Sequence, residues 1–253
     1  MPSICPSCFD PVAPSESPLP NLGEITNAPR GSGSSRYDLV VQQLIPGYAS
    51  LARLSVALLA VSPRACHPGA EVLVAGCGTG AELVEARSQR PDWRITAIDP
   101  AAAMLTAAQA RLGKDASPSI HWQQARVEDL QAEGRFAGAL SVLVLQSLAD
   151  DGTKLRFLTA LARSLEPAGQ LVLVDRMAAE RSALQNQVDQ ALLAFQRASG
   201  LSDPDGQLEE LTEATHPIGR SRLTALVNAA GFGDPAPIFQ ALGYEGFLLQ
   251  RLA

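Results

Sequence analysis

The feature that most constrains this chain is a regular alternation of short β-rich segments with helical segments, which begins after a Pro-Gly pair at residues 68–69. Apolar periodicity predicts strands at residues 71–75, 93–98, 119–122, 139–144 and 170–174, and helices at residues 79–89, 101–112 and 153–165. Such alternation is typical of right-handed βαβ crossovers, which build a mostly parallel sheet with helices on both faces. We therefore expect an α/β protein with a doubly wound sheet whose ligand lies at the carboxyl ends of the strands.

The N-terminal part of the chain differs in composition from the rest. Residues 1–35 hold seven of the 18 prolines and lack a periodic apolar pattern. This composition predicts a disordered tail ahead of a single domain at residues 36–253. Helical spacing of apolar residues then predicts two helices before the first strand, separated by a break at Pro46 and Gly47.

The C-terminal part departs from the alternation. An apolar stripe at residues 183–195 predicts an amphipathic helix packed on the domain, within a lid-like insertion at residues 182–218. A further helix is expected at residues 219–230. Two strands joined by a turn, at residues 236–241 and 244–252, predict an antiparallel C-terminal hairpin.

Length and charge restrict the class of partner. The chain has 253 residues and 46% apolar content, which suits one α/β domain with an ample core. A formal net charge of -6 without a run of basic residues argues against nucleic acid and favours a small molecule. The chain shows no signal peptide and no segment long enough to span a bilayer, so we expect a cytoplasmic protein without a membrane partner. A homodimer is compatible with this composition.

The four cysteines indicate neither a disulfide framework nor a metal site. Cys5 and Cys8 form a lone CxxC pair, and Cys77 lies within a glycine loop. Structural zinc usually needs four ligands, and only Cys66 and His67 are available to complete the pair. We therefore expect no bound metal.

The strongest motif is EVLVAGCGTG at residues 71–80, a strand that enters a glycine-rich loop ahead of a helix. Glycines allow a sharp turn and a close approach of the backbone to a ligand, and the helix start supplies free N–H groups. Glycine also punctuates turns that bind nothing, so this motif alone leaves a ligand-free βα turn open.

Asp99 strengthens the interpretation of the glycine loop. It ends the strand ITAI, about 20 residues beyond the loop, where an acid accepts hydrogen bonds from ribose hydroxyls in nucleotide-binding βαβ units. The combination predicts a Rossmann-like site for a nucleoside ligand. The dinucleotide pattern GxGxxG is not matched strictly, because Ala81 and Glu82 follow Gly80, so NAD is the weaker option.

A family resemblance rests on the order of these motifs along the chain. The sequence resembles the class I methyltransferases that depend on S-adenosylmethionine (SAM), from about Tyr37 to the C-terminus. The motifs that carry the resemblance are VLVAGCGTG, AIDP, AAML at residues 102–105, VEDL at 127–130, LQSL at 145–148 and LEPAGQLVLVD. Within the superfamily, Tyr37-Asp38 and residues 45–48, IPGY, are similar to the branch that contains carboxy-S-adenosylmethionine synthase.

The resemblance implies a role for residues around the glycine loop. Gly76, Cys77 and Gly78 would lie against the methionine and ribose portions of SAM. Asp99 would bind the ribose hydroxyls, a role that its position at the end of an apolar strand supports independently. Tyr48 would close over the cofactor from the N-terminal helices.

Four further residues would surround the adenine. By the same resemblance, Pro100 and Met104 would lie beside the ring, and Arg126 and Val127 would flank its edge. Met104 and Val127 are apolar, so ordinary core packing remains an alternative for both.

Three positions depart from the family pattern. Val74 stands where an acid usually helps to hold the cofactor's ammonium group, and Arg126 stands where an acid usually lies near adenine. With valine at position 74, that ammonium needs backbone carbonyls, water or another acid such as Glu71, or else SAM binds more weakly. The arginine with which the synthase branch binds an extra carboxylate falls near Leu208 in this chain, which disfavours synthesis of carboxy-SAM.

The resemblance predicts methyl transfer to a small-molecule acceptor by in-line displacement, for which the protein supplies alignment and exclusion of water. A base is needed only if the acceptor must lose a proton. His216 is the candidate base, with Tyr48 as a second candidate, and Gln146 would orient the acceptor by hydrogen bonding. An exposed loop position is the alternative for His216. A non-catalytic SAM-binding protein and a carboxy-SAM synthase-like enzyme remain as alternative functions.

Overall fold

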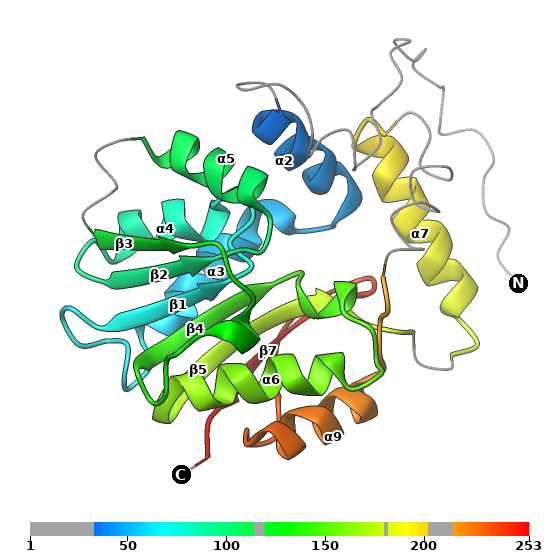
Figure 1. The fold of residues 1–253 in the computed structure, drawn as a ribbon. Helices are drawn as coiled ribbons and strands as arrows, with labels where there is room; N and C mark the ends of the chain where they lie inside the picture. The colour runs from blue at the N-terminus through cyan, green and yellow to red at the C-terminus, as the bar shows by residue number, and fades with distance from the viewer. Residues whose placement is uncertain (1–32, 114–118, 180–181, 202–214, 253) are drawn as a thin grey trace, which may run out of the picture.

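The computed structural model describes residues 33–113, 119–179, 182–201 and 215–252. Seven strands form one sheet in the order β3-β2-β1-β4-β5-β7-β6 (Figure 1). The strands are β1 (Glu71–Ala75), β2 (Arg94–Ile98), β3 (Ile120–Gln123), β4 (Phe136–Val142), β5 (Leu165–Arg176), β6 (Ala236–Ala241) and β7 (Tyr244–Gln250). The first five pair in parallel, whereas β7 is antiparallel to both β5 and β6. The Rossmann-like α/β fold with an antiparallel C-terminal hairpin is thus confirmed.

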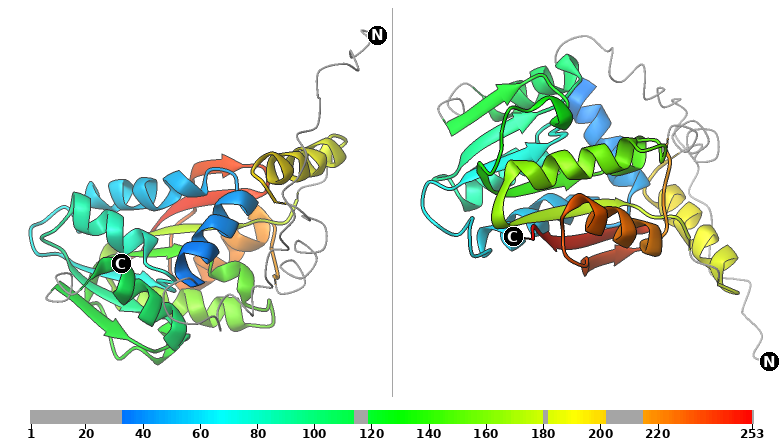
Figure 2. Two further views of the ribbon diagram at one scale, coloured as in Figure 1. Left: turned by 90° about the horizontal axis from the view of Figure 1, so that it is seen from above. Right: turned by 60° about the horizontal axis from the view of Figure 1, so that its bottom comes forward.

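Helices cover both faces of the sheet because side chains alternate along each strand. In β1, Val72 and Val74 contribute to the core beneath the first four helices, and Leu73 and Ala75 contribute to the core on the opposite face. Figure 2 shows α6 and α9 side by side on that second face. The helices are α2 (Gly33–Leu44), α3 (Tyr48–Ala60), α4 (Ala81–Gln89), α5 (Ala102–Leu112), α6 (Thr153–Ser164), α7 (Gln185–Ala198) and α9 (Arg220–Ala230), with short 3₁₀ turns η2 (Val127–Asp129) and η3 (Leu145–Ser147).

Several strand boundaries differ from the sequence prediction, most of all in β4 and β5. β4 ends at Val142 rather than at residue 144, because Leu143 adopts a left-handed φ of 61° and turns the chain over the sheet edge. β5 begins at Leu165, a residue that apolar periodicity assigns to the preceding helix, and continues to Arg176. Pairing with β4 on one side and β7 on the other supports this longer strand, so tertiary pairing overrides local pattern.

The N-terminal helices meet at a sharp bend. Gly47 has φ 82° at the break, and buried apolar side chains of both helices join the core on the first face of the sheet. The predicted tail at residues 1–35 lies outside the described residues except for its last three, which are helical because α2 begins at Gly33. Among the described residues, no single helix is long and apolar enough to cross a membrane; α2 and α3 meet such a criterion only together, across their 96° bend.

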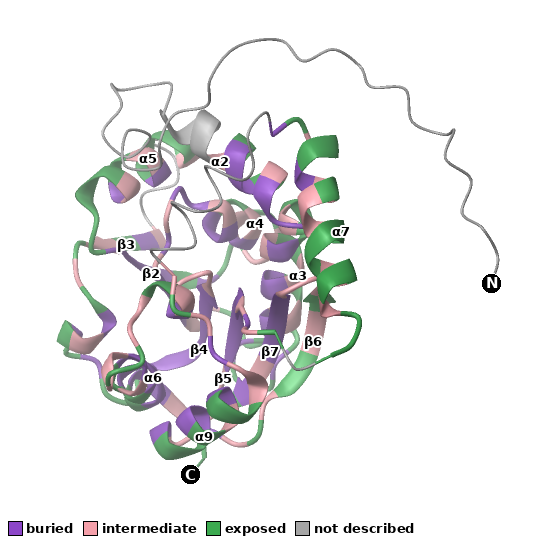
Figure 3. Ribbon diagram, turned by 90° about the vertical axis from the view of Figure 1, so that its right-hand side faces the viewer, coloured by how far each residue is buried: buried purple, intermediate pink, exposed green. Residues whose placement is uncertain are grey.

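The lid-like insertion contains α7, which lies beside α2 at the edge of the domain (Figures 1 and 3). Most of its outer surface is exposed, and Val188, Leu192 and Phe195 of the predicted apolar stripe are half-buried. Leu184, also assigned to that stripe, precedes the helix and is 64% exposed. Residues 202–214 of the insertion lie outside the described residues.

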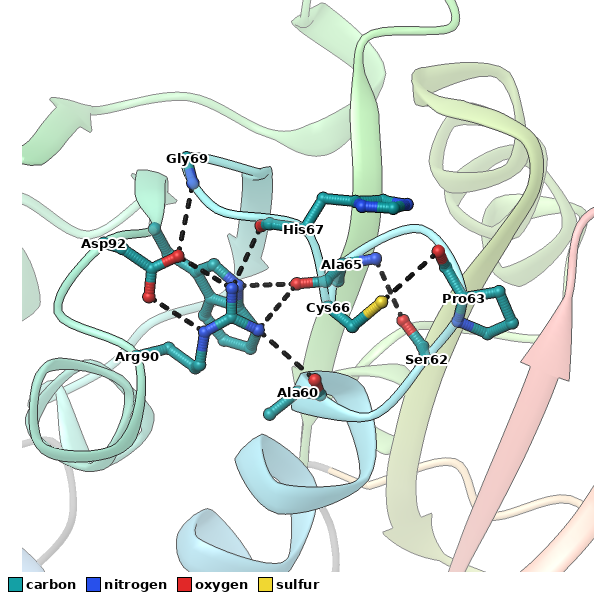
Figure 4. Close-up of polar contacts among 10 residues, drawn as sticks. Ala60, Ser62, Pro63, Ala65, Cys66, His67, Gly69, Arg90 and Asp92 are labelled. Atoms are coloured by element: carbon teal, nitrogen blue, oxygen red, sulfur yellow. Dashed lines mark hydrogen bonds and ion pairs between the residues drawn. The ribbon is translucent and has the colours of Figure 1, made fainter.

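Arg90 organises the loop that leads into the amino end of β1 (Figure 4). Its guanidinium donates to the carbonyls of Ala60, Ala65 and His67 at 2.9–3.2 Å and forms an ion pair with Asp92 at 2.7 Å. This partner lowers the pKa of Asp92. The loop that contains Cys66 and His67 therefore has a structural role at the edge of the sheet opposite to the carboxyl ends of the strands, and the described residues contain no metal-binding cluster. Cys5 and Cys8 lie outside the described part of the chain.

Candidate active site

The glycine loop crosses the carboxyl end of β1 and is held against β2. Backbone N–H groups of Gly76 and Cys77 both donate to the carbonyl of Ile98 at 2.9 Å. Gly76 has φ 68°, and a Cβ there would overlap a methyl carbon of Val144, so packing requires glycine. A Cβ on Gly78, at φ 49°, would meet no atom within 4 Å. Gly78 therefore faces open space in which a ligand can approach the backbone closely.

Asp99 is fixed directly beside this loop. One carboxylate oxygen accepts the N–H of Gly78 at 3.0 Å and the other accepts the N–H of Ala101 at 2.9 Å. The side chain is 7% exposed, and burial raises its pKa while the two hydrogen bonds oppose the rise. A preorganised carboxylate at the end of β2 can accept hydrogen bonds from a diol without rearranging.

A cavity of about 280 Å³ lies over the carboxyl ends of β1, β2 and β4. The structure brings together in its wall Tyr48, Gly76, Cys77, Gly78, Asp99, Pro100 and Met104. Arg126 and Val127 do not line it. Val127 is 4% exposed and packs in the core beneath α6, and Arg126 is exposed at the start of η2. Their contact with adenine stays a prediction.

The electrostatic character of this cavity is acidic. Its described wall contains two carboxylates, Glu82 and Asp99, and no lysine or arginine. Burial raises the pKa of Glu82 to about 7 and that of the Cys77 thiol to about 12. An acidic wall without a basic side chain disfavours a dinucleotide, whose phosphates are anionic, and favours a nucleoside that carries positive charge.

Glu82 did not emerge from the sequence as a site residue. It is the second residue of α4, and acids are common in the first turn of helices because they interact favourably with the helix dipole. Its position therefore carries no signal of a site. Glu71, the acid expected to compensate for Val74, lies at the amino end of β1 and pairs with Arg135 at 2.5 Å, so it belongs to the opposite edge of the sheet.

A polar network ties α2 to the glycine loop. Asp38 accepts a hydrogen bond from the hydroxyl of Thr79 at 2.6 Å and forms an ion pair with Arg111 of α5 at 2.6 Å. Three segments far apart in the sequence thereby meet beside the cavity. Tyr48, at the start of α3, is held over the cavity by the bend that follows α2.

A second cavity of about 510 Å³ lies one strand further along the sheet, over the end of β5 and the β6–β7 turn, with α7 on its outer side. Arg176 and Tyr244 are adjacent in its wall, and burial raises the pKa of Tyr244. Arg220 also lines it and forms an ion pair with Glu245 at 2.7 Å. Its volume falls within the range of small-molecule pockets.

The loop after β4 carries Gln146 and lies between these two cavities. The carboxylate of Asp175 accepts the N–H groups of Leu145 at 3.2 Å and Gln146 at 2.8 Å, and the ammonium of Lys154 donates to the Leu145 carbonyl. Burial raises the pKa of Asp175 to about 7. His216 donates its backbone N–H to the Gln146 carbonyl at 2.6 Å, so the two predicted catalytic residues are adjacent.

The Gln146 side chain is engaged within the protein, whereas His216 lies at an exposed loop position. The Gln146 Oε1 already accepts the backbone N–H of Arg176 at 3.1 Å, and the His216 residue is exposed. Neither residue lines the two cavities, although Ser147 lines the first and Pro217 the second.

Comparison with known proteins identifies the superfamily. Residues 72–169 match the model of a methyltransferase domain. Carboxy-S-adenosyl-L-methionine synthase of Pseudomonas putida is 25% identical over 219 residues, which cover 83% of this chain and 86% of the relative. The domain match, these relatives and the fold support a place in the class I superfamily of SAM-dependent methyltransferases. The chain lies near the branch of carboxy-SAM synthases, and its cofactor is SAM.

Solved methyltransferases share this fold at low sequence identity. Human N-acetylserotonin methyltransferase in complex with SAM superposes with a TM-score of 0.61 at 17% identity, over 94% of this chain and 61% of that chain. A 1,6-didemethyltoxoflavin-N1-methyltransferase of Burkholderia thailandensis gives a TM-score of 0.58 at 19% identity, over 95% of both chains. The methyltransferase described here therefore has a solved structural neighbour of nearly its own length.

Proposed function

We propose that this methyltransferase transfers the methyl group of SAM to a small-molecule acceptor. The observation that carries the proposal is the acidic cavity, in which the open backbone at Gly78 adjoins the fixed carboxylate of Asp99. SAM combines a ribose, which suits Asp99, with positive charge, which suits an acidic wall. The Burkholderia neighbour was solved with bound 1,6-didemethyltoxoflavin and S-adenosylhomocysteine, which supports a small-molecule acceptor.

In this proposal, different residues of the cavity wall contact different parts of the cofactor. Asp99 accepts hydrogen bonds from the ribose hydroxyls, and the backbone of residues 76–78 lies against the ribose and methionine portions. Pro100 and Met104 flank the adenine. The family resemblance adds Arg126 and Val127 at its edge, outside the described cavity wall. Tyr48 covers the cofactor and helps to exclude water.

The second cavity is the proposed acceptor site. It adjoins the cofactor cavity across neighbouring strands β4 and β5, and α7 covers its outer side as a lid. When bound, SAM supplies an electrophilic methyl group on its sulfonium. The protein then aligns the acceptor with that group and keeps water out, the two contributions that in-line displacement needs.

His216 and Gln146 support the acceptor in this proposal. The backbone bond between them holds His216 at the loop between the cavities, where its imidazole can take a proton from an acidic acceptor. The Gln146 Oε1 is engaged by the Arg176 backbone, so the amide NH₂ group would orient the acceptor.

A direct test measures binding and turnover separately. Calorimetric titration of SAM into the full chain reports the cofactor site. Formation of S-adenosylhomocysteine in the presence of a cell extract as the source of acceptor reports methyl transfer. Binding without turnover across extracts would favour the alternative of a non-catalytic SAM-binding protein, and absence of binding would overturn the proposal.

A carboxy-SAM synthase-like activity is the second candidate, because relatives with that name match most of this chain. Leu208, which aligns with the branch's arginine, lies outside the described residues. Two arginines further along the chain are candidate substitutes: Arg222 forms an ion pair with Asp150 at 2.9 Å, and Arg220, which lines the second cavity, forms one with Glu245 at 2.7 Å. We expect no carboxymethyl-sulfonium product when the protein is incubated with SAM and prephenate and examined by mass spectrometry. Such a product would show that Arg220 or Arg222 replaces the missing arginine.

A further inference from the structure

Glu82 is a buried carboxylate in the wall of the cofactor cavity. Its residue is 7% exposed, and its carboxylate accepts a hydrogen bond from its own backbone N–H. Among the described residues, no cationic side chain forms an ion pair with it. A buried carboxylate without a cationic partner is costly, so folding alone does not favour an acid at this position.

The charged groups around Glu82 do not supply that partner. The guanidinium of Arg111 in α5 forms its ion pair with Asp38 of α2, so Arg111 affects Glu82 only through space. Arg111 lowers the pKa of Glu82 and Asp38 raises it, and the other ionisable side chains of the described cavity wall are Tyr48, Asp99 and the neutral thiol of Cys77. The Glu82 carboxylate therefore has no ion-pair partner among the described residues, and the nearest positive charge, that of Arg111, is shared with Asp38.

The other acids of this region are unsuited to the amino-acid end of the cofactor. Asp99 is already held by the N–H groups of Gly78 and Ala101 at the position proposed for ribose. Glu71 lies at the opposite edge of the sheet, and Val74, at 2% exposure, presents only an apolar side chain to the core. Glu82 is thus the remaining carboxylate of the described cavity wall.

We propose that Glu82 binds the α-ammonium group of the methionine portion of SAM, in place of the acid that Val74 lacks. This inference rests on the proposed cofactor site. A charge-assisted hydrogen bond between carboxylate and ammonium would give the buried acid its partner and would orient the methionine portion along the start of α4.

The test compares two ligands that differ in the amino-acid portion. S-adenosylhomocysteine carries the ammonium group, whereas 5′-methylthioadenosine keeps the adenosine and the sulfur but lacks the amino acid. Calorimetry on the full chain would compare wild type, Glu82→Gln and a matched control, Glu85→Gln, which removes an acid from the same helix on a side that faces Arg53. We expect Glu82→Gln to weaken S-adenosylhomocysteine about tenfold or more and to change methylthioadenosine less than about twofold. Glu85→Gln should change neither.

Wild-type protein provides an independent readout. Because burial raises the pKa of Glu82 to about 7, ammonium binding must displace its proton below that pH, and S-adenosylhomocysteine affinity should rise roughly eightfold between pH 6 and pH 7.5. Methylthioadenosine binding should lack this slope, and so should Glu82→Gln with either ligand. The wild-type slope keeps the proposal testable even if the variant fails to fold.

These outcomes distinguish failure of the proposed cofactor site from failure of the role of Glu82. Wild type that binds neither ligand would overturn the proposed cofactor site itself. Wild type that binds S-adenosylhomocysteine without a pH slope, or a folded Glu82→Gln protein that binds it as tightly as wild type does, would overturn the role of Glu82 alone.

Discussion

The ligand-free protein should become more stable when Glu82 is replaced by glutamine. Burial raises the pKa of this carboxyl from 4.5 to about 7, so the folded protein holds the proton more tightly than the unfolded chain does. The stability of wild type should therefore fall as pH rises from about 4.5 to 7, with the full cost present above 7. At 1.36 kcal/mol per pH unit, this difference corresponds to about 3 kcal/mol.

Urea unfolding measures this cost. The free energy of unfolding of wild type and Glu82→Gln would be compared at pH 5, 6, 7 and 8 without ligand, with the fluorescence of the buried Trp93 as the signal. Glutamine cannot ionise, so the advantage of the variant should be small at pH 5 and grow to about 3 kcal/mol at pH 8. Asp175 also has a pKa raised to about 7, and its contribution cancels because both proteins contain it.

A ligand and a control variant sharpen the comparison. Saturating S-adenosylhomocysteine should reduce the advantage of Glu82→Gln, because the ammonium supplies wild type with the missing partner. Glu85→Gln should show no pH-dependent gain. A difference between wild type and Glu82→Gln that stays constant from pH 5 to pH 8 would refute the reasoning, since it would mean that the carboxyl ionises equally well in the folded and unfolded states.

Three further outcomes follow from the site. Gly78→Ala should lose about 1 kcal/mol of stability but bind S-adenosylhomocysteine much more weakly, because its methyl group enters the open space that the ligand needs. Gly76→Ala should lose about 2 kcal/mol or more in thermal melts, because its methyl group overlaps Val144. If the two variants lost stability and ligand affinity to the same extent, Gly78 would not face open space. Asp99→Ala should weaken the same ligand by about tenfold in calorimetry, and unchanged binding would remove Asp99 from the ribose site. The sequence predicts tighter binding for Val74→Asp; with Glu82 in the cavity wall we expect that gain only in the Glu82→Gln background, and a gain in wild type would show that the ammonium lacks a partner.

Local pattern was sufficient for the framework of the site. The strand that enters the glycine loop and the strand that ends at Asp99 are both continuous apolar segments, and their lengths and spacing predict that the loop and the acid meet at one sheet edge. Of the predicted cofactor residues, seven line the cavity; six of them belong to this part of the chain, and the seventh, Tyr48, was named by family resemblance from the N-terminal helices. Such motifs are visible in sequence because a backbone turn requires glycine, and a strand end fixes the direction of the next side chain.

Contacts between distant segments were beyond the sequence. Asp38 and Arg111 pair although they are 73 residues apart, and Arg90 joins a loop that precedes it by 23 to 30 residues. The extension of β5 back to Leu165 depends on pairing with β4, and its extension to Arg176 depends on β7, the last strand of the chain. Neither hydrophobic periodicity nor motif spacing contains information about such partners.

Neighbouring residues were enough to predict the Rossmann-like sheet, the cofactor loop and the superfamily, because apolar runs, glycine positions and motif spacing are local properties of a sequence. The identity of the important ionisable groups emerged from the folded domain. Glu82 resembles any acid in a first helical turn until packing of the folded domain buries it, and Glu71 resembles a site acid until its strand places it at the far edge. Burial and charge environment arise from packing between distant elements, and they determine where a carboxylate needs a cation.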